Sequence, residues 1–142
     1  MLELTEEALV AASVDAVWAD LTESHRLVEW IWPQRFEATA EVELRELGRW
    51  HIRSDVAELA VEATVLTVDR PRSLRLAWKW AGEERSTDVE IMLAGAADGA
   101  TRVTVRHTGF LSADERASHV EGWSNCLQRL IDRYGGTPGE HL

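Results

Sequence analysis

The chain has 142 residues, of which 45% are apolar and 28% are charged, a balance typical of a globular protein. Its 15 Lys and Arg face 25 Asp and Glu, which gives a formal net charge of −10. Nucleic acids and anionic membranes are bound through clustered basic side chains, so the composition argues against both as partners. Residues 1–142 are expected to form a single domain.

The cysteine content and the N-terminal residues bear on where the protein works. Cys126 is the only cysteine, so the chain cannot form an internal disulfide. No apolar run reaches the roughly 18 residues that a membrane span needs. Residues 1–7 lack the basic and apolar regions of a secretory signal. Since a chain without disulfides suits a reducing compartment, we predict a cytoplasmic protein.

The first 33 residues predict a strand followed by two short helices. Residues 2–11 fit an edge strand. In residues 13–21, Ser13 is a capping residue, and four apolar side chains then recur at helical spacing. A second short helix is expected over residues 24–30, and Pro33 ends it.

From residue 36 to residue 109 the hydrophobic period is two, which is typical of strands with one buried and one solvated face. Strands are expected at residues 36–45, 50–53, 60–68, 74–80, 87–93 and 101–108. Their connections are short and contain turn-forming residues such as Gly48, Gly82 and Gly99. Short connections join neighbouring strands as hairpins, so the sheet is expected to be antiparallel.

The last predicted element is a long amphipathic helix. Ser112 and Glu115 form a capping-box pattern at its start, and Gly135 with Gly136 ends it. One apolar stripe runs along it: Val120, Trp123, Leu127, Leu130, Ile131 and Tyr134. This stripe and the dry face of the sheet must cover each other. The expected fold is therefore α+β, a curved antiparallel sheet of six to seven strands around this helix, with two short helices after the first strand.

Several segments occur in an order that resembles a known family. They are Val17-Trp18-Ala19-Asp20-Leu21-Thr22, Trp30 with Trp32-Pro33, Gly48 with Trp50, Val68-Asp69-Arg70-Pro71-Arg72-Ser73-Leu74, Trp78, Gly99-Ala100-Thr101-Arg102-Val103-Thr104-Val105, His107-Thr108-Gly109-Phe110, and Gly122-Trp123 with Leu127 and Leu130. This set resembles the SRPBCC superfamily of START-like, helix-grip domains, in the branch of the activator of heat-shock-protein-90 ATPase. The resemblance implies a pocket between sheet and long helix, which in related branches holds lipids, hormones or polyketides. The family's usual Gly-Gly-aromatic turn has one glycine here, in Leu47-Gly48-Arg49-Trp50.

Tryptophan is the most prominent feature of the composition, with seven residues in the chain. Four are expected on the dry side of the sheet or on the helix stripe: Trp50, Trp78, Trp80 and Trp123. The helix-grip layout implies that Trp30 and Trp32 lie at the pocket entrance. Each ring can simply fill the core, because a buried Trp removes roughly 200 Å² from water. Facing rings of this width also leave gaps that suit a flat apolar ligand, so both interpretations stay open.

His107 is the one histidine expected to point inward, because it shares the strand parity of Val103 and Val105. A buried imidazole needs a hydrogen-bond partner or stays neutral. His107 can therefore be a hydrogen-bonded core residue, orient a polar group of a ligand, or act as an acid or base.

No other pattern in the sequence indicates catalysis or a metal site. The histidines do not occur at ligand spacing, and the chain has no Cys-x-x-Cys pair and no Gly-x-Ser-x-Gly motif. Cys126 adjoins the apolar stripe of the last helix, where a thiol serves as a small apolar group. We therefore expect no cofactor, no metal and no catalytic residue.

The expected function is non-catalytic binding of a small hydrophobic or aromatic ligand in the cavity between sheet and helix. The expected ligand contacts are Trp30, Trp32, Trp50, Trp78, Trp80, His107, Trp123 and Leu127. One alternative is an enzyme of the cyclase, dehydratase or hydrolase kind, with His107 as its acid–base group. The other is a co-chaperone-like module that binds a chaperone. Assembly as a homodimer is compatible with each of these.

Overall fold

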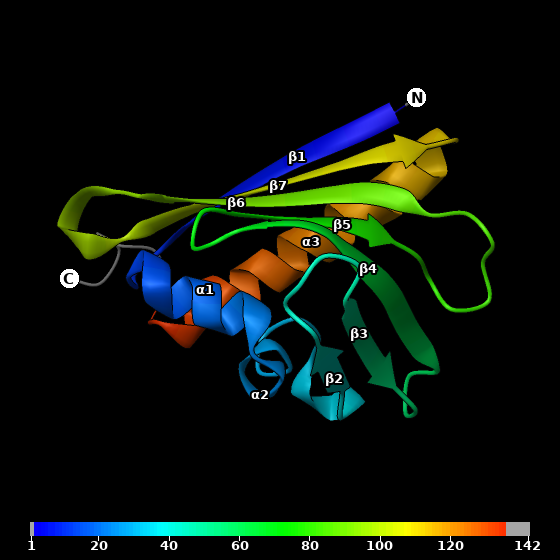
Figure 1. Cartoon of the computed structure of the whole chain (residues 1–142), viewed down its shortest axis with the longest axis horizontal. Coiled ribbons are helices and arrows are strands. Elements are labelled where there is room, and N and C mark those ends of the chain that lie inside the picture. The colour runs from blue at the N-terminus through cyan, green and yellow to red at the C-terminus, as the bar shows by residue number, and fades with distance from the viewer. Residues whose placement is uncertain (1, 136–142) are drawn as a thin grey trace.

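The computed structural model describes residues 2–135, which form a seven-stranded antiparallel sheet and a long helix (Figure 1). The elements are β1 (Leu2–Val10), α1 (Val14–Thr22), α2 (Ser24–Leu27), the 3-10 turn η1 (Gln34–Phe36), β2 (Thr39–Val42), β3 (Arg49–Ser54), β4 (Leu59–Asp69), β5 (Ser73–Trp78), β6 (Thr87–Gly95), the turn η2 (Ala97–Gly99), β7 (Thr101–Phe110) and α3 (Ala113–Arg133). The predicted helix stop at Gly136 lies outside the described residues.

The strands lie side by side in the order β1-β7-β6-β5-β4-β3-β2. From β2 to β7, neighbours in the sheet are also neighbours in the chain, whereas β1 pairs with the last strand, where Leu4 lies opposite His107. The sheet curves, and α3 runs along its hollow side (Figure 1). The predicted α+β helix-grip architecture is confirmed. Among residues 2–135, no helix combines the length and the apolar character that crossing a bilayer demands.

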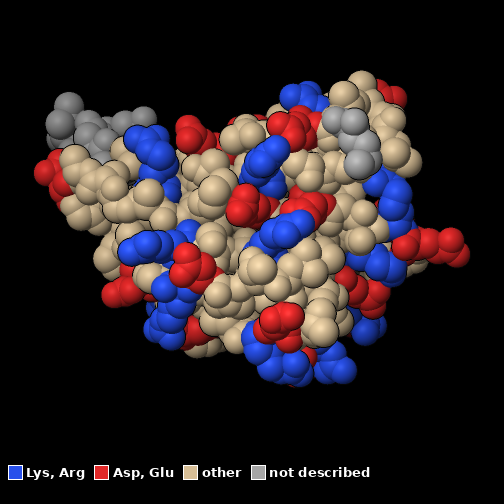
Figure 2. Space-filling view, turned by 45° about the horizontal axis from the view of Figure 1, so that its top comes forward, with Lys and Arg blue, Asp and Glu red and all other residues tan. Residues whose placement is uncertain are grey.

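Burial follows the predicted alternation along the strands. In β7, Val103, Val105 and His107 are buried, whereas Arg102 and Arg106 are exposed. The outer face of the sheet carries charged pairs that bridge neighbouring strands, such as Arg75 and Asp88 at 2.7 Å. Figure 2 shows basic and acidic side chains interspersed over the face that it presents, with no broad area of one sign.

Two predicted elements are shorter than expected. The strand predicted over residues 36–45 is limited to β2, because the chain after Pro33 first closes the turn η1 and Glu37 then takes a left-handed conformation with φ 50°. The helix predicted over residues 24–30 ends at Leu27. Beyond it the backbone forms tighter turns, in which Glu29 N donates to Arg26 O.

Both longer helices begin at the serines that the sequence predicts. Ser13 Oγ accepts a hydrogen bond from Ala16 N, and Ser112 Oγ accepts one from Glu115 N, each at 3.1 Å. The Glu115 carboxylate accepts from Leu111 N at 3.3 Å, one residue before the position that a capping box predicts.

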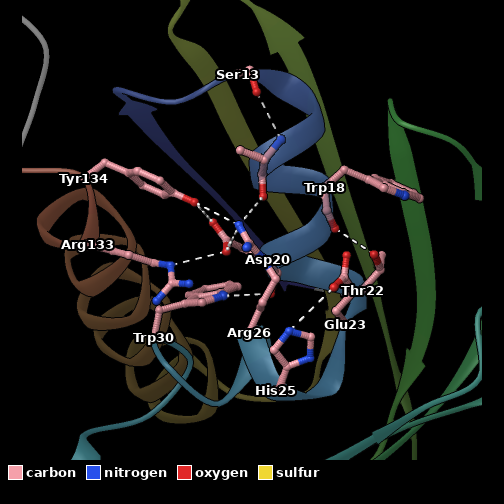
Figure 3. Close-up of polar contacts among 11 residues, drawn as sticks. Ser13, Trp18, Asp20, Thr22, Glu23, His25, Arg26, Trp30, Arg133 and Tyr134 are labelled. Carbon is pink, nitrogen blue, oxygen red and sulfur yellow. Dashed lines mark hydrogen bonds and ion pairs between the residues drawn. The ribbon is translucent and has the colours of Figure 1, made fainter.

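A buried carboxylate joins the C-terminal end of α3 to α1 and α2 (Figure 3). Asp20 is fully buried. Its Oδ1 lies 2.9 Å from Arg26 Nη2 and 3.2 Å from Arg133 Nε, and its Oδ2 accepts a hydrogen bond from the Tyr134 hydroxyl. Two guanidinium groups and a hydroxyl thus compensate the buried charge. This cluster fixes where α3 ends on the helical layer.

Candidate functional site

A pocket of about 190 Å³ opens between the N-terminal half of α3, the end of β5 and the segment after α2. It is lined by Ile31, Trp32, Trp78, Trp80, Ser118, His119, Gly122, Trp123 and Cys126. None of these side chains is a carboxylate, an amine or a guanidinium. The volume is below the roughly 300–1,000 Å³ of pockets for drug-sized ligands, so the site suits a small, uncharged molecule.

Four tryptophans form a continuous aromatic wall in this pocket. The rings of Trp32 and Trp80 are nearly parallel, with centroids 6.4 Å apart. Trp78 stands almost perpendicular to Trp80 at 5.9 Å, and its centroid lies 5.3 Å from that of Trp123. The four rings come from the segment after α2, from β5 and the residues after it, and from α3. The predicted placement of these four tryptophans around one cavity matches the lining of this pocket.

His119 lines the pocket, although the sequence analysis assigned it no role. Its Nε2 accepts a hydrogen bond from Trp80 Nε1 at 3.0 Å. An indole N–H is only a donor, so Nε2 carries no proton and Nδ1 donates to Glu115 O at 2.8 Å. His119 is therefore neutral in this arrangement, and it holds the partly buried Trp80 against α3.

His107 lies beneath the pocket, fully buried, and is not part of its lining. Its Nδ1 accepts from Trp123 Nε1 at 3.0 Å, which leaves the imidazole proton on Nε2, 2.6 Å from Thr87 Oγ1. Burial, with a smaller contribution from the nearby His119, lowers the pKa of His107 to about 3. Both ring nitrogens are thus engaged inside the protein. The expectation that His107 orients a ligand is not met by this geometry.

Three other predicted ligand contacts are core residues in this structure. Trp50 is fully buried, and its Nε1 donates to Leu21 O at 3.1 Å. Trp30 and Leu127 border a gap of only about 10 Å³ inside the core. Strand parity and helix spacing place these side chains on the correct face, but they lie deeper than the pocket.

The segment that carries Trp32 is fastened to α3 through its backbone. Arg129 donates from Nε to Trp30 O at 2.9 Å and from Nη2 to Ile31 O at 3.0 Å. Cys126 Sγ donates to Ile31 O at 2.8 Å. Burial raises the pKa of the Cys126 thiol to about 11, which is the opposite of what a nucleophilic cysteine needs.

One polar atom of the aromatic wall has no partner. Trp78 Nε1 is buried and makes no hydrogen bond with any other described residue. A buried donor without an acceptor costs about 1–3 kcal/mol, so such groups are rare in folded proteins. This unsatisfied donor marks the pocket as a place where packing is not optimised for stability alone.

The chemistry available in the pocket favours binding over reaction. Among its lining residues only His119 and Cys126 carry ionisable side chains, and both are held by hydrogen bonds within the protein. Within residues 2–135, no group of three His, Cys, Asp or Glu side chains is arranged to hold a metal ion.

Solved structures with the same fold are similar to this chain over nearly its whole length. Ms6760 from Mycobacterium smegmatis is 24% identical, with a TM-score of 0.79 over 93% of this chain and 90% of that chain. The Aha1 dimer from Colwellia psychrerythraea is 17% identical, with a TM-score of 0.78 over 98% and 100%. PFC0360w, an HSP90 activator from Plasmodium falciparum, is 14% identical, with a TM-score of 0.76 over 95% and 97%. At these identities the likeness shows the fold alone.

No match was found among curated proteins. The family model described as "Activator of Hsp90 ATPase homolog 1-like protein" matches residues 11–135, which include every residue of the pocket. The chain belongs to this family, as its resemblance to the activator of heat-shock-protein-90 ATPase predicted.

Proposed function

We propose that this protein binds a small, uncharged, apolar or aromatic molecule in the pocket between α3 and the sheet, without converting it. The observation that carries the proposal is that Trp32, Trp78, Trp80 and Trp123 surround an open volume of about 190 Å³. Four indoles packed only for stability would fill that volume, because protein interiors are close-packed.

The proposed ligand contacts are these four tryptophans together with Ile31 and His119. His107 takes a supporting role, since it accepts the hydrogen bond that orients Trp123. A catalytic alternative needs an acid or base that reaches the substrate. Neither imidazole has a free ring nitrogen in this structure, which weighs against cyclase, dehydratase or hydrolase chemistry.

The test is a titration of intrinsic tryptophan fluorescence with a panel of uncharged aromatic compounds and fatty acids. Trp80→Phe keeps an aromatic ring but loses part of the pocket wall and the hydrogen bond to His119. We expect it to weaken binding about fivefold or more, a loss of roughly 1 kcal/mol or more of binding free energy. Trp18→Phe makes the same exchange outside the pocket and should leave affinity unchanged.

A saturable signal that depends on Trp80 and not on Trp18 would support the pocket as a binding site. A flat response of the wild-type protein across a chemically broad panel would overturn the proposal, and the tryptophans would then serve packing. Circular dichroism of both variants shows whether an altered response reflects altered folding.

The family match favours a second candidate function, modulation of an Hsp90 chaperone. It is carried by the family description and by the fold that this chain shares with an HSP90 activator. The test is the ATPase rate of purified Hsp90 with increasing amounts of this protein. A saturable rise would support it, and an unchanged rate at excess protein would exclude it. Light scattering of the purified protein tests the proposed homodimer.

A further inference from the structure

We propose that the pocket takes a flat, uncharged ligand of about two fused aromatic rings, which lies against the bare backbone of α3 at Gly122. This inference rests on the proposed function and adds the shape of the ligand and the residue that admits it. It makes Gly122 the position that determines specificity.

The helix wall of the pocket is built from small residues. Ser118, Gly122 and Cys126 are four positions apart, so they lie on one face of α3, and all three line the pocket. His119 and Trp123 border them on the same side. Without a large side chain between Ser118 and Cys126, the backbone of the helix forms part of the pocket surface.

Gly122 is not explained by the packing of the protein. It lies in the middle of a 21-residue helix, where glycine is less favourable than alanine. A Cβ atom built at this position would meet no atom within 4 Å, so close packing does not exclude a side chain. Its backbone is helical and not left-handed, so conformation does not require glycine either. What a side chain here would occupy is the open pocket.

The opposite side of the pocket consists of broad aromatic faces. Trp32 and Trp80 are within 5° of parallel and extend each other, and Trp78 and Trp123 close the floor. A planar ring system gains contact with indole faces and loses little conformational freedom on binding, whereas an acyl chain must be ordered at each bond. A pocket of about 190 Å³ without a charged lining side chain limits that ligand to a small, neutral molecule.

The test compares substitutions of increasing size at Gly122, with 2-naphthol as the planar probe and laurate as the flexible one, by isothermal titration calorimetry. Gly122→Ala should weaken 2-naphthol binding about threefold and Gly122→Leu more than about tenfold, since each fills more of the mouth. Both variants should raise the Tm by about 2–4 °C, because alanine and leucine favour helix over glycine. Higher stability with lower affinity is the result that a purely structural glycine does not give.

Gly95→Ala is the matched control. Gly95 is exposed at the end of β6, far along the chain from the pocket residues, and an added Cβ there would lie 3.9 Å from Val14 Cγ2, an ordinary contact. This variant should bind 2-naphthol as the wild type does.

Each failure points to a different part of the argument. Wild-type protein that binds neither probe nor any member of the fluorescence panel overturns the proposed function. Wild-type protein that binds laurate more tightly than 2-naphthol leaves the pocket standing but overturns the planar ligand. Unchanged affinity of a folded Gly122→Leu protein overturns the role of Gly122.

Discussion

The indole of Trp123 donates to Nδ1 of His107 at 3.0 Å, and this bond decides which nitrogen of the imidazole carries the proton. The protonated Nε2 then lies 2.6 Å from Thr87 Oγ1 in β6. A single side chain of β7 is therefore bonded to α3 on one side and to β6 on the other. His107 acts as a brace that sets the position of Trp123 in the pocket wall.

This brace predicts a pH-dependent stability. Burial lowers the pKa of His107 from its ordinary 6.5 to about 3 in the folded protein. Between these values the unfolded chain takes up a proton that the folded protein does not. The free energy of unfolding should therefore be unaffected by His107 above about pH 6.5 and fall by roughly 1.4 kcal/mol per pH unit between pH 6 and pH 4. Urea unfolding at a series of pH values measures this slope.

His107→Gln is the control for that slope, because glutamine is polar but does not titrate. Carboxylates also titrate near pH 4, but they are common to both proteins. The variant should be less stable at pH 7.5 and lose less stability on acidification, with a slope smaller by one proton. Identical slopes would show that His107 is protonated in the folded protein.

The Thr87 hydroxyl should contribute through the same brace. Thr87→Val keeps the shape of the side chain but leaves the Nε2–H of His107 without its acceptor, so we expect a loss of about 1–3 kcal/mol in the free energy of unfolding. Thr87→Ser keeps the hydroxyl and should lose much less. If both variants unfold at the same urea concentration, the hydrogen bond contributes nothing.

Cys126 should react slowly with alkylating reagents. Its thiol donates to Ile31 O, and burial raises its pKa from 9.0 to about 11, so the reactive thiolate is about a hundredfold scarcer than in an unfolded chain. The rate of iodoacetamide labelling at pH 8, followed by mass spectrometry, should rise at least that much in urea. Labelling of the native protein at the unfolded rate would contradict the burial of this thiol.

The carboxylate cluster at the end of α3 should be a major source of stability. Asp20→Asn leaves Arg26 and Arg133 without the buried charge that they share, and we expect a loss of about 3 kcal/mol. Tyr134→Phe removes one hydrogen bond to the same carboxylate and should cost about 1 kcal/mol. Urea unfolding of both variants at pH 7 gives the two values, and an Asp20→Asn protein as stable as the wild type would rule out this role.

The fold could be predicted because its signals are local. The alternation in β7 and the stripe from Trp123 to Leu130 each define one buried face, and short turns leave few ways to bring those faces together. The boundaries near Phe36 were harder, because residues 36–45 alternate like a strand although Glu37 turns the chain with a positive φ.

The site was predicted only in part, because parity gives the side of a sheet and not the depth below a pocket. Trp50 and Trp78 both point inward, yet only Trp78 reaches the cavity. His119 was missed because it lies at the border of the apolar stripe, and its partner Trp80 is 39 positions earlier in the chain. Its spacing of four residues from Trp123 was the available signal. Asp20 was missed for the same reason, since its partner Tyr134 is 114 positions away.

The pairing of β1 with β7 has a consequence for biosynthesis. Glu3 in β1 and Arg106 in β7 form an ion pair across 103 positions, so the first strand to leave the ribosome waits for one of the last. Contacts this distant in sequence slow folding, because the intervening chain must be ordered before they form. The meander from β2 to β6 can assemble during synthesis, but one edge of the sheet stays open until β7 emerges. Translation of the final third of the chain, and not the start of synthesis, is therefore the stage at which the nascent protein becomes protected from aggregation.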